Sequence, residues 1–440
     1  MTRRPARVAQ PEHALQEQPL LKGMSNEFAD TRPSRNQILD DDRPIHDWYR
    51  FVLSFPPHLV REYFGRFGVG EDDVVLDPFC GTGTTLVEAK KMGVRSVGIE
   101  AVPMSAFAAS TKLDWTINPT QLDRDADLVA ERTHATGEEP LRRLPPNQEQ
   151  LLLRRSISPL PLHRSLVLRD EIDQLNGPTR AHLRLALARE LPSGIGNLRF
   201  GPEIGLGEIK EDAPVVERWR SRVDQMARDL ERWSSRAAIA ARVESGDART
   251  PARLLQPDSI DAVITSPPYP NEKDYTRTVR LESVLLGFLD SRESLRAVKR
   301  GLVRSNTRSV YKQDDDDASL AQFPKITALA DEIEAKRIEL GKTSGFEKMY
   351  HRVTRLYFGG MARHLQSLQP ALKPGAQLAY VVGDQASYFR IMIRTGELLA
   401  EIAERLGYEV IGIDLFRTRA ATATRAQINE EVLLLRWPGP

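Results

Sequence analysis

The sequence has one cysteine, no long apolar run and almost no net charge, and each of these absences excludes a class of protein. Cys80 is the only cysteine among 440 residues, so an intramolecular disulfide framework and a zinc site built on several cysteines are excluded. No apolar run approaches the roughly 18 residues that a membrane-spanning helix needs. The basic start, MTRRPAR, lacks the apolar stretch of a secretory signal. We therefore expect a cytoplasmic protein that binds no membrane.

The charges nearly cancel, because 62 Lys and Arg residues stand against 61 Asp and Glu residues and give a formal net charge of +1. A protein that is basic all over is thereby excluded, and any surface for nucleic acid must be a local patch. Hydrophobic residues make up 40% of the chain and charged residues 28%, a mixture typical of globular proteins. A chain of this length forms two or three domains, or one core with large insertions.

A βαβ unit opens the ordered part of the sequence. The short apolar run Val74–Asp77 is bounded by turn residues, which predicts a buried strand. A helical pattern over Thr84–Met92 stops at Gly93, and residues 96–100 predict the next strand. Strands joined by a helix in this way pair in parallel. Further strand-like runs lie at residues 260–265, 378–382, 409–415 and 431–437.

Two insertions interrupt the predicted sheet domain, which comprises residues 45–119 and 240–440. Residues 120–239 are rich in Arg and Leu and show helical patterns, so we expect a helical insertion. Residues 290–345 form a second insertion within the sheet domain. Residues 1–44 are rich in Pro, Arg, Gln and Asp, a composition typical of a flexible arm.

One helix of the first insertion has a clear pattern. Apolar residues recur at the spacing of a single helix face, which predicts an amphipathic helix, and Asp212 is expected to cap its start. The apolar positions are Val216, Trp219, Val223, Met226, Leu230 and Trp233.

The string DPFCGTGTT, which starts at Asp77, follows a predicted strand and opens a helix. Glycines at such a helix start let a ligand approach the backbone amides, and Glu100, at the end of the next strand, is placed to take the ribose hydroxyls of a nucleoside. The loop lacks the lysine of a phosphate-binding loop, and its aspartate would repel a pyrophosphate. The pattern therefore favours a nucleoside that carries a cationic sulfonium over NAD.

A second motif, Ser266-Pro267-Pro268-Tyr269, directly follows the strand predicted over residues 260–265. Two prolines halt the strand and stiffen the turn. The turn presents the Ser266 hydroxyl, the Pro267 carbonyl and the Tyr269 ring at a strand end, where sites form in open α/β sheets. Two acceptors suit the exocyclic amine of a nucleobase, whose lone pair is otherwise delocalised, and Tyr269 suits stacking on a flipped base.

Together the two motifs resemble those of the DNA amino-methyltransferases, which methylate cytosine N4 or adenine N6 with S-adenosylmethionine. The resemblance covers residues 46–115 and 240–437. It implies a Rossmann-like class I methyltransferase fold, an α/β structure with a mostly parallel seven-stranded sheet, an antiparallel edge hairpin and helical insertions. It also implies double-stranded DNA as the substrate and a target-recognition role for residues 120–239, and it leaves open a restriction or defence-system partner and the oligomeric state.

The resemblance assigns roles to residues. The glycine loop holds the methionine part of the cofactor, Asp247 and Ala248 match the acidic contact to its adenine, and Phe55 matches the motif at its carboxylate end. The cofactor-binding residues so implied are Phe55, Asp77, Pro78, Phe79, Cys80, Gly81, Thr82, Gly83, Thr84, Glu100, Asp247 and Ala248. The catalytic residues so implied are Ser266, Pro267, Pro268 and Tyr269, and this serine form is commoner among enzymes that act on cytosine N4.

Other candidate sites are weaker. Cys80 lies inside the cofactor loop, where a packing role is favoured over that of a thiolate nucleophile for cytosine C5. The string Gly341-Lys342-Thr343-Ser344 lacks the leading glycine of a phosphate-binding loop, because position 336 is lysine. No metal site is expected: the histidines lack ligand spacing, and the acidic run at 314–317 is typical of a solvated loop.

Basic residues gather after the catalytic turn. The stretch 292–308 holds six Lys and Arg residues against one acid, and Arg417, Arg419 and Arg425 lie in a segment with no acid between them. Beside a base-modifying site, such residues favour a surface that contacts DNA phosphates. We expect methylation of DNA at cytosine N4, with adenine N6, an RNA base methyltransferase, or a DNA-binding regulator on a decayed fold as alternatives.

Overall fold

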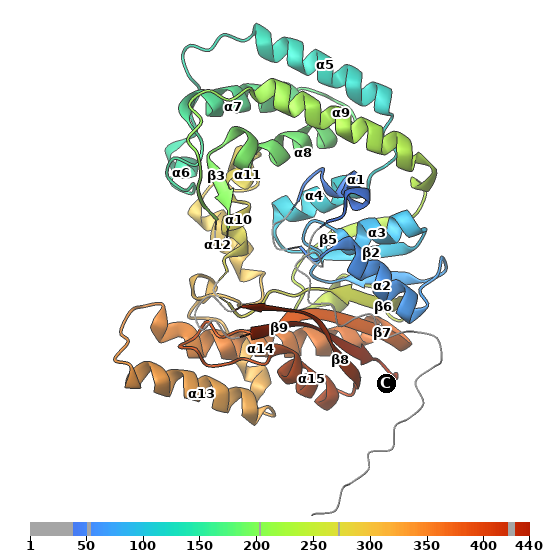
Figure 1. The fold of residues 1–440 in the computed structure, drawn as a ribbon, viewed down its shortest axis with the longest axis vertical. Helices are drawn as coiled ribbons and strands as arrows, with labels where there is room; N and C mark the ends of the chain where they lie inside the picture. The colour runs from blue at the N-terminus through green and yellow to red at the C-terminus, as the bar shows by residue number, and fades with distance from the viewer. Residues whose placement is uncertain (1–37, 51–53, 202–203, 272, 421–426) are drawn as a thin grey trace, which may run out of the picture.

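The computed structural model describes residues 38–50, 54–201, 204–271, 273–420 and 427–440, without the side chains of residues 419 and 420. A seven-stranded sheet lies at its centre, with the strand order β5-β2-β1-β6-β7-β9-β8 (Figure 1). The strands of this sheet are Ala241–Ser245 (β5), Arg95–Glu100 (β2), Val74–Asp77 (β1), Ile260–Thr265 (β6), Leu372–Gly383 (β7), Gln427–Arg436 (β9) and Glu409–Ala420 (β8). A small antiparallel pair, β3 (Leu198–Phe200) and β4 (Ile204–Leu206), stands apart from it.

The pairing of the strands confirms the predicted fold class. The strands from β5 to β7 pair in parallel, and β9 runs antiparallel to both β7 and β8. The chain therefore has the Rossmann-like class I methyltransferase arrangement, with an antiparallel hairpin at one edge. Strands β7, β8 and β9 extend, at one or both ends, beyond the apolar runs that predicted them. The polar residues at these strand ends do not show the alternating pattern by which a strand is recognised in a sequence.

Both faces of the sheet are buried, which explains the continuous apolar runs of its strands. Neighbouring residues of β1 point to opposite faces: Val75 packs in one cluster with Leu59 and Phe64 of helix α2, and Leu76 packs in another with Phe358 and Leu365 of helix α14. Helices therefore cover the sheet on both sides, as in other doubly wound folds.

The helices around the sheet and in the insertions are as follows. They are α1 (Arg43–His46), α2 (Pro57–Phe67), α3 (Thr84–Met92), α4 (Pro103–Leu113), α5 (Pro119–Ala135), α6 (Pro146–Glu149), α7 (Pro159–Asp173), α8 (Arg180–Glu190), α9 (Val215–Trp233), α10 (Tyr275–Thr278), α11 (Arg280–Leu285), α12 (Arg292–Arg300), α13 (Pro324–Glu339), α14 (Tyr350–Leu368) and α15 (Thr395–Arg405). Short 3₁₀ turns include Asp40–Asp42, Pro251–Arg253, Thr307–Ser309 and Asp316–Leu320.

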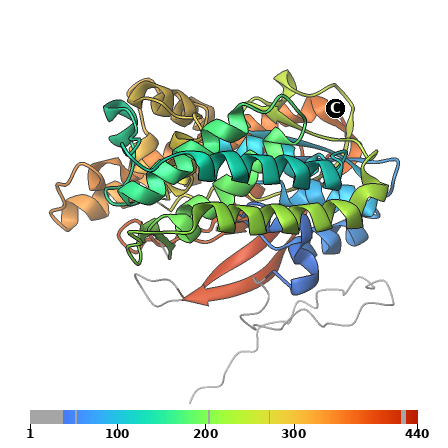
Figure 2. The ribbon, with the colours of Figure 1, turned by 90° about the horizontal axis from the view of Figure 1, so that it is seen from above.

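The first insertion forms a helical layer on one side of the sheet (Figure 1). Helices α5 and α9 lie next to each other across the top of the molecule, as Figure 2 also shows. One apolar cluster joins the insertion to the sheet domain, since it contains Met104 of α4 together with Leu183 of α8 and Trp219 of α9. This continuous core fixes the insertion beside α4, the helix that follows β2.

Helix α9 has the predicted amphipathic pattern, but its start differs from the prediction. Trp219 and Met226 are fully buried, as the apolar spacing predicts. The N-cap is Pro214, which makes no capping hydrogen bond, and Asp212 instead forms an ion pair with Arg164 of α7, with 2.5 Å between Nη1 and Oδ1. The cap prediction was wrong because an arginine from a distant helix engages the carboxylate.

Residues 1–37 of the predicted arm lie outside the described residues. The described part of the arm includes Asp42, which is buried and pairs with Arg61 of α2 at 2.8 Å. Directly behind it, the backbone amide of Ile45 donates to Asp229 of α9. None of the helices in the described parts of the chain is both long and apolar enough to cross a membrane.

Candidate active site

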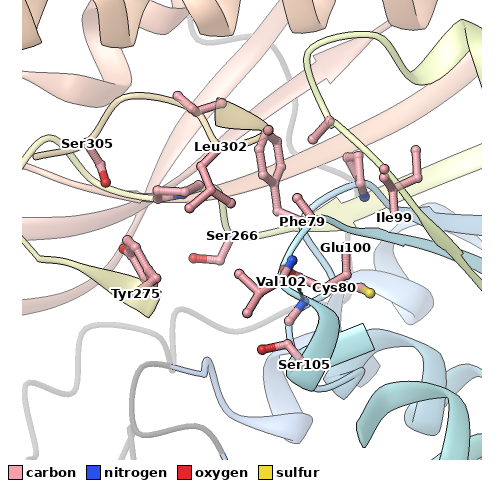
Figure 3. Close-up of a pocket in the computed structure, with 18 of the residues that line it drawn as sticks. Phe79, Cys80, Ile99, Glu100, Val102, Ser105, Ser266, Tyr275, Leu302 and Ser305 are labelled. Carbon is pink, nitrogen blue, oxygen red and sulfur yellow. Dashed lines mark hydrogen bonds between the residues drawn. The ribbon is translucent and has the colours of Figure 1, made fainter. Parts of the chain in front are cut away.

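A pocket opens at the carboxyl ends of β1, β2 and β6, where the strand order changes direction between β1 and β6. Ligands bind at such a switch point in open α/β sheets. The pocket encloses about 960 Å³, a volume that includes the open solvent at its mouth. Six chain segments line it: the residues just before α2, the glycine loop, the end of β2 with the start of α4, the turn after β5, the residues after β6, and part of the second insertion (Figure 3).

The glycine loop wraps around one side of the pocket and needs its glycines. Gly81 and Gly83 have φ of +52° and +82°, a left-handed conformation that favours glycine. Beneath the loop, the buried Lys112 of α4 donates to the Thr82 carbonyl at 2.8 Å, and burial lowers the pKa of Lys112 to about 7. The loop is therefore held from behind, while Gly81 and Thr84 face the pocket.

Glu100 is at the end of β2, where the sequence predicts it, and lines the pocket. Its Oε2 accepts from the Gly81 amide at 2.9 Å and its Oε1 accepts from the Val102 amide at 2.7 Å. Burial raises its pKa to about 7, although both amides oppose the rise. Each carboxylate oxygen keeps a further lone pair for a ligand hydroxyl.

Asp77 lies behind the glycine loop and not at the pocket surface. Its Oδ1 accepts from the Thr265 hydroxyl at 2.6 Å and from the Phe79 amide at 3.1 Å. Burial raises its pKa to about 6, against the lowering effect of the Thr265 hydroxyl. In this structure Asp77 joins the loop after β1 to the end of β6, so it positions the two motifs relative to each other.

Cys80 lines the pocket with its thiol buried against β2. A β-carbon at Gly98 would lie 2.7 Å from its Sγ and 2.6 Å from Leu86 Cδ1, so the sulfur fills space that only a glycine leaves open. Burial raises the thiol pKa well above its ordinary value. A buried thiol with a raised pKa is a packing residue and a poor nucleophile, which agrees with the interpretation from sequence.

The turn after β5 brings Gly246 and Ala248 to the pocket. The Ala248 carbonyl accepts from Nδ1 of the buried His364 at 2.6 Å, and the Tyr380 hydroxyl lies 2.7 Å from Nε2. Because burial lowers the pKa of His364 to about 4, the ring is neutral, with its proton on Nδ1 and Nε2 accepting from Tyr380. The side chain of Asp247 is bound by Arg249, with 2.6 Å between Oδ2 and Nη2.

Ser266 and Pro268 of the proline turn line the pocket. The Ser266 hydroxyl donates to the Val381 carbonyl of β7 at 3.1 Å. Tyr269 is placed differently: a β-carbon at Gly383 would lie 3.1 Å from its ring. Its amide donates to the hydroxyl of Tyr275 at 3.3 Å, and Tyr275 is the tyrosine that lines the pocket.

The second insertion supplies a wall of the pocket that sequence reasoning missed. Residues 301–309 contribute Leu302, Val303, Ser305 and Asn306 to the lining, among others. In the sequence this segment carries no glycine motif or strand pattern that could have marked it. Contacts between residues that are distant in the sequence bring this segment to the pocket.

The acidic run at 314–317 holds that wall in place and is not a solvated loop. Asp316 is fully buried, and its Oδ2 pairs with Arg249 Nη1 at 2.6 Å. Its Oδ1 pairs with Arg363 at 2.5 Å, and Asp314 pairs with the buried Arg304 at 2.7 Å. The earlier interpretation was wrong because distant arginines supply buried partners for these carboxylates.

The predicted phosphate-contacting surface is only partly present. In the stretch 292–308, Lys299 is buried against Asp274 at 2.7 Å, and Arg304 is buried as described above. Arg417 pairs with Glu430 across the β8–β9 hairpin. All three cations are therefore engaged in ion pairs, with Lys299 and Arg304 buried and Arg417 half-buried. The side chain of Arg419 and all of Arg425 lie outside the described residues. The exposed cations of the stretch are Arg292, Arg296, Arg300 and Arg308.

Comparisons with known proteins agree with this geometry. The family model N6_N4_Mtase, a DNA methylase, matches residues 31–104. The Type II methyltransferase M.BsoBI of Geobacillus stearothermophilus is 24% identical over 431 residues, which cover 87% of this chain and 82% of that protein. The Type II methyltransferase M.AvaI of Nostoc sp. is 22% identical over 414 residues, which cover 84% of this chain and 80% of that protein. The chain therefore resembles the DNA amino-methyltransferases.

This similarity agrees with the prediction of S-adenosylmethionine as the cofactor. A shorter similarity joins the chain to the tRNA (guanine(10)-N2)-dimethyltransferase of Methanothermobacter thermautotrophicus. It amounts to 51% identity over 65 residues, which cover 15% of this chain and 18% of that protein. The two Type II methyltransferases are similar over most of their length, whereas this RNA enzyme shares only a short segment.

Proposed function

We propose that the chain is a site-specific DNA methyltransferase that acts on the exocyclic amine of a flipped base, with cytosine N4 favoured. The bond from the Ser266 hydroxyl to the Val381 carbonyl is the observation that carries this proposal. A hydroxyl has one proton to donate and two lone pairs. Because the proton of Ser266 is engaged with β7, its oxygen faces the pocket as an acceptor, which is what an incoming amine requires.

The proposed mechanism uses hydrogen-bond acceptors and no strong base. The Ser266 oxygen and the Pro267 carbonyl accept the two N–H groups of the amine, which turns the nitrogen towards a tetrahedral geometry and frees its lone pair. The methylated amine is a cation, and it releases a proton to water. Tyr269, or Tyr275 in its place at the pocket, offers an aromatic face for the flipped base.

The lining residues fit S-adenosylmethionine, which when bound supplies a methyl group on a positively charged sulfur. A β-carbon at Gly81 would meet no atom within 4 Å, so the loop borders open space. Glu100 presents its remaining lone pairs to the ribose hydroxyls, and Gly246 and Ala248 border the adenine. Phe55 also lines the pocket, consistent with the end that holds the methionine carboxylate.

The substrate proposal is double-stranded DNA. Two relatives that match over most of their length are named Type II methyltransferases, which supports a site-specific enzyme with a cognate restriction partner. Residues 120–239 are the proposed target-recognition region, and the protein is proposed to be cytoplasmic. The serine of the catalytic turn favours cytosine N4 over adenine N6, and an RNA base is the remaining alternative.

Nucleoside mass spectrometry on the purified protein tests this proposal. The protein and S-adenosylmethionine are incubated with unmethylated genomic DNA and, in parallel, with total RNA. We expect N4-methylcytosine in the DNA and no new methylated base in the RNA. N6-methyladenine in the DNA would correct the base, and methylation confined to RNA would overturn the proposal.

A further inference from the structure

We infer that Ser305, which belongs to the second insertion, contacts the flipped base and donates a hydrogen bond to the ring nitrogen beside the exocyclic amine. This inference rests on the proposed function, because it assigns a residue to the substrate of that reaction. It also gives the second insertion a role in base selection, in addition to its role as a wall of the cofactor pocket.

The position of Ser305 in the pocket is the first observation. In Figure 3, Glu100, Ile99 and Cys80 lie at one end of the cavity, while Ser266 points towards the end where Tyr275 and Ser305 lie. The first end is the one that Glu100 marks for the cofactor ribose. The second end is therefore the place for the group that receives the methyl.

The hydrogen bonding of Ser305 is the second observation. Ser305 is only 2% exposed, and within the described part of the chain its hydroxyl has no hydrogen-bond partner. The two neighbouring polar residues are engaged: Ser309 donates to Asn306 Oδ1 at 3.2 Å, and Asn306 Nδ2 donates to the Lys273 carbonyl at 3.0 Å. The Ser305 hydroxyl is therefore free to donate to a ligand in the pocket, which Ser305 lines.

Two contacts hold Ser305 in a fixed relation to the catalytic turn. Lys299, at the end of α12, pairs with Asp274 at 2.7 Å, and Asn306 bonds to the Lys273 carbonyl. Both acceptors lie in the segment that follows the proline turn of Ser266. The wall and the catalytic turn therefore form one frame around the end of the pocket.

The chemistry of the target base fits this pair of hydroxyls. Cytosine and adenine each present an amine next to an unprotonated ring nitrogen, which is N3 in cytosine and N1 in adenine. The Ser266 oxygen accepts from the amine, and a donor is needed for the neighbouring nitrogen. A flipped base is recognised by such bonds to its Watson–Crick edge, and Ser305 supplies the donor.

The test compares Ser305→Ala with Ser309→Ala, which removes the neighbouring hydroxyl that is already engaged with Asn306. Methylation of unmethylated genomic DNA is measured as a function of DNA concentration, and S-adenosylmethionine binding is measured by calorimetry without DNA. Ser305→Ala is expected to lower kcat/KM for DNA at least about tenfold with cofactor Kd within about twofold. Ser305→Cys, which keeps the size but weakens the donor, should lie between Ser305→Ala and the natural protein.

Three results would overturn the inference while the natural protein methylates DNA. The first is an unchanged methylation rate in Ser305→Ala. The second is an equal loss of methylation rate in Ser309→Ala, which would indicate a loosened wall. The third is a parallel loss of cofactor affinity in Ser305→Ala, which would place Ser305 at the cofactor. A natural protein that binds cofactor but methylates no base in DNA would instead contradict the proposed function itself.

Discussion

Arg249 and Asp316 form a buried ion pair, with 2.6 Å between Nη1 and Oδ2, that joins the turn after β5 to the acidic run of the second insertion. Arg249 also binds Asp247 and the Arg300 carbonyl. One guanidinium thus connects the turn after β5 with the second insertion, and both of these segments line the pocket. The pair therefore holds the second insertion against the pocket.

Removing the carboxylate from this pair should weaken both the fold and cofactor binding. Asp316→Ala removes the carboxylate that the buried Arg249 shares with the half-exposed Arg363, and breaking a buried pair costs about 3 kcal/mol. We expect that loss in the free energy of unfolding, from denaturant titration, and a cofactor Kd at least about tenfold higher. Asp317→Asn, in the same run, is the control and should change neither. Equal effects in both variants would show that the pair has no special role.

The pH dependence of cofactor binding should follow Glu100. Its pKa is raised to about 7 by burial, and ribose hydroxyls bind the ionised carboxylate, so affinity is present above pH 7 and is lost as the pH falls. Between pH 8 and pH 6 the ionised fraction falls about tenfold, and the association constant from calorimetry should fall with it. Glu100→Gln should bind more weakly and show a flatter profile. An unchanged slope in that variant would assign the titration to another group, such as Lys112.

The thiol of Cys80 should be dispensable for methyl transfer. Its sulfur packs against β2 beside Gly98 and takes part in no proposed step. Cys80→Ala should therefore keep at least half of the methylation rate and lose about 1 kcal/mol of stability through the small cavity. Native protein should also resist iodoacetamide, since the thiol is buried. A loss of activity beyond a hundredfold with cofactor binding retained would point to a nucleophilic thiol.

Gly383 of β7 should be needed for the placement of Tyr269. A β-carbon there would lie 3.1 Å from the Tyr269 ring and 3.4 Å from Glu430 Cγ. Gly383→Ala is expected to lower the methylation rate about tenfold, with cofactor Kd unchanged, because the ring must move. Gly412→Ala on β8 is the matched control, since a β-carbon there would meet nothing within 4 Å. Equal methylation rates for these two variants and the natural protein would show that the placement of the Tyr269 ring does not matter for the reaction.

Most of the sheet could be predicted from the sequence because its strands are buried on both faces. Val74–Asp77 and Ile260–Thr265 have the predicted bounds, since each is a continuous apolar run that ends in a turn motif. The glycine loop and the proline turn were recognisable because they need particular residues, such as Gly81 and Gly83 in left-handed conformations. Local chemistry of this kind is visible in a sequence.

The second insertion could not be predicted because its role depends on contacts between distant residues. Nothing in the spacing of Arg249 and Asp316 indicates that they meet. Lys299 and Arg304 are buried, although the exposed cations of the same stretch are residues of the same types. Asp212 shows the same effect on a smaller scale, since a distant arginine binds a residue whose local position predicts a cap. Burial of charge is decided by tertiary packing, which local patterns do not report.

The most direct test of the proposed mechanism is to measure the methylated base that the Ser266→Ala variant produces. The natural protein and this variant are incubated with S-adenosylmethionine and unmethylated genomic DNA, and the nucleosides are measured by mass spectrometry. The proposed mechanism predicts N4-methylcytosine with the natural protein, a loss of about a hundredfold or more in the variant, and equal cofactor binding in both. Undiminished methylation by Ser266→Ala would contradict it.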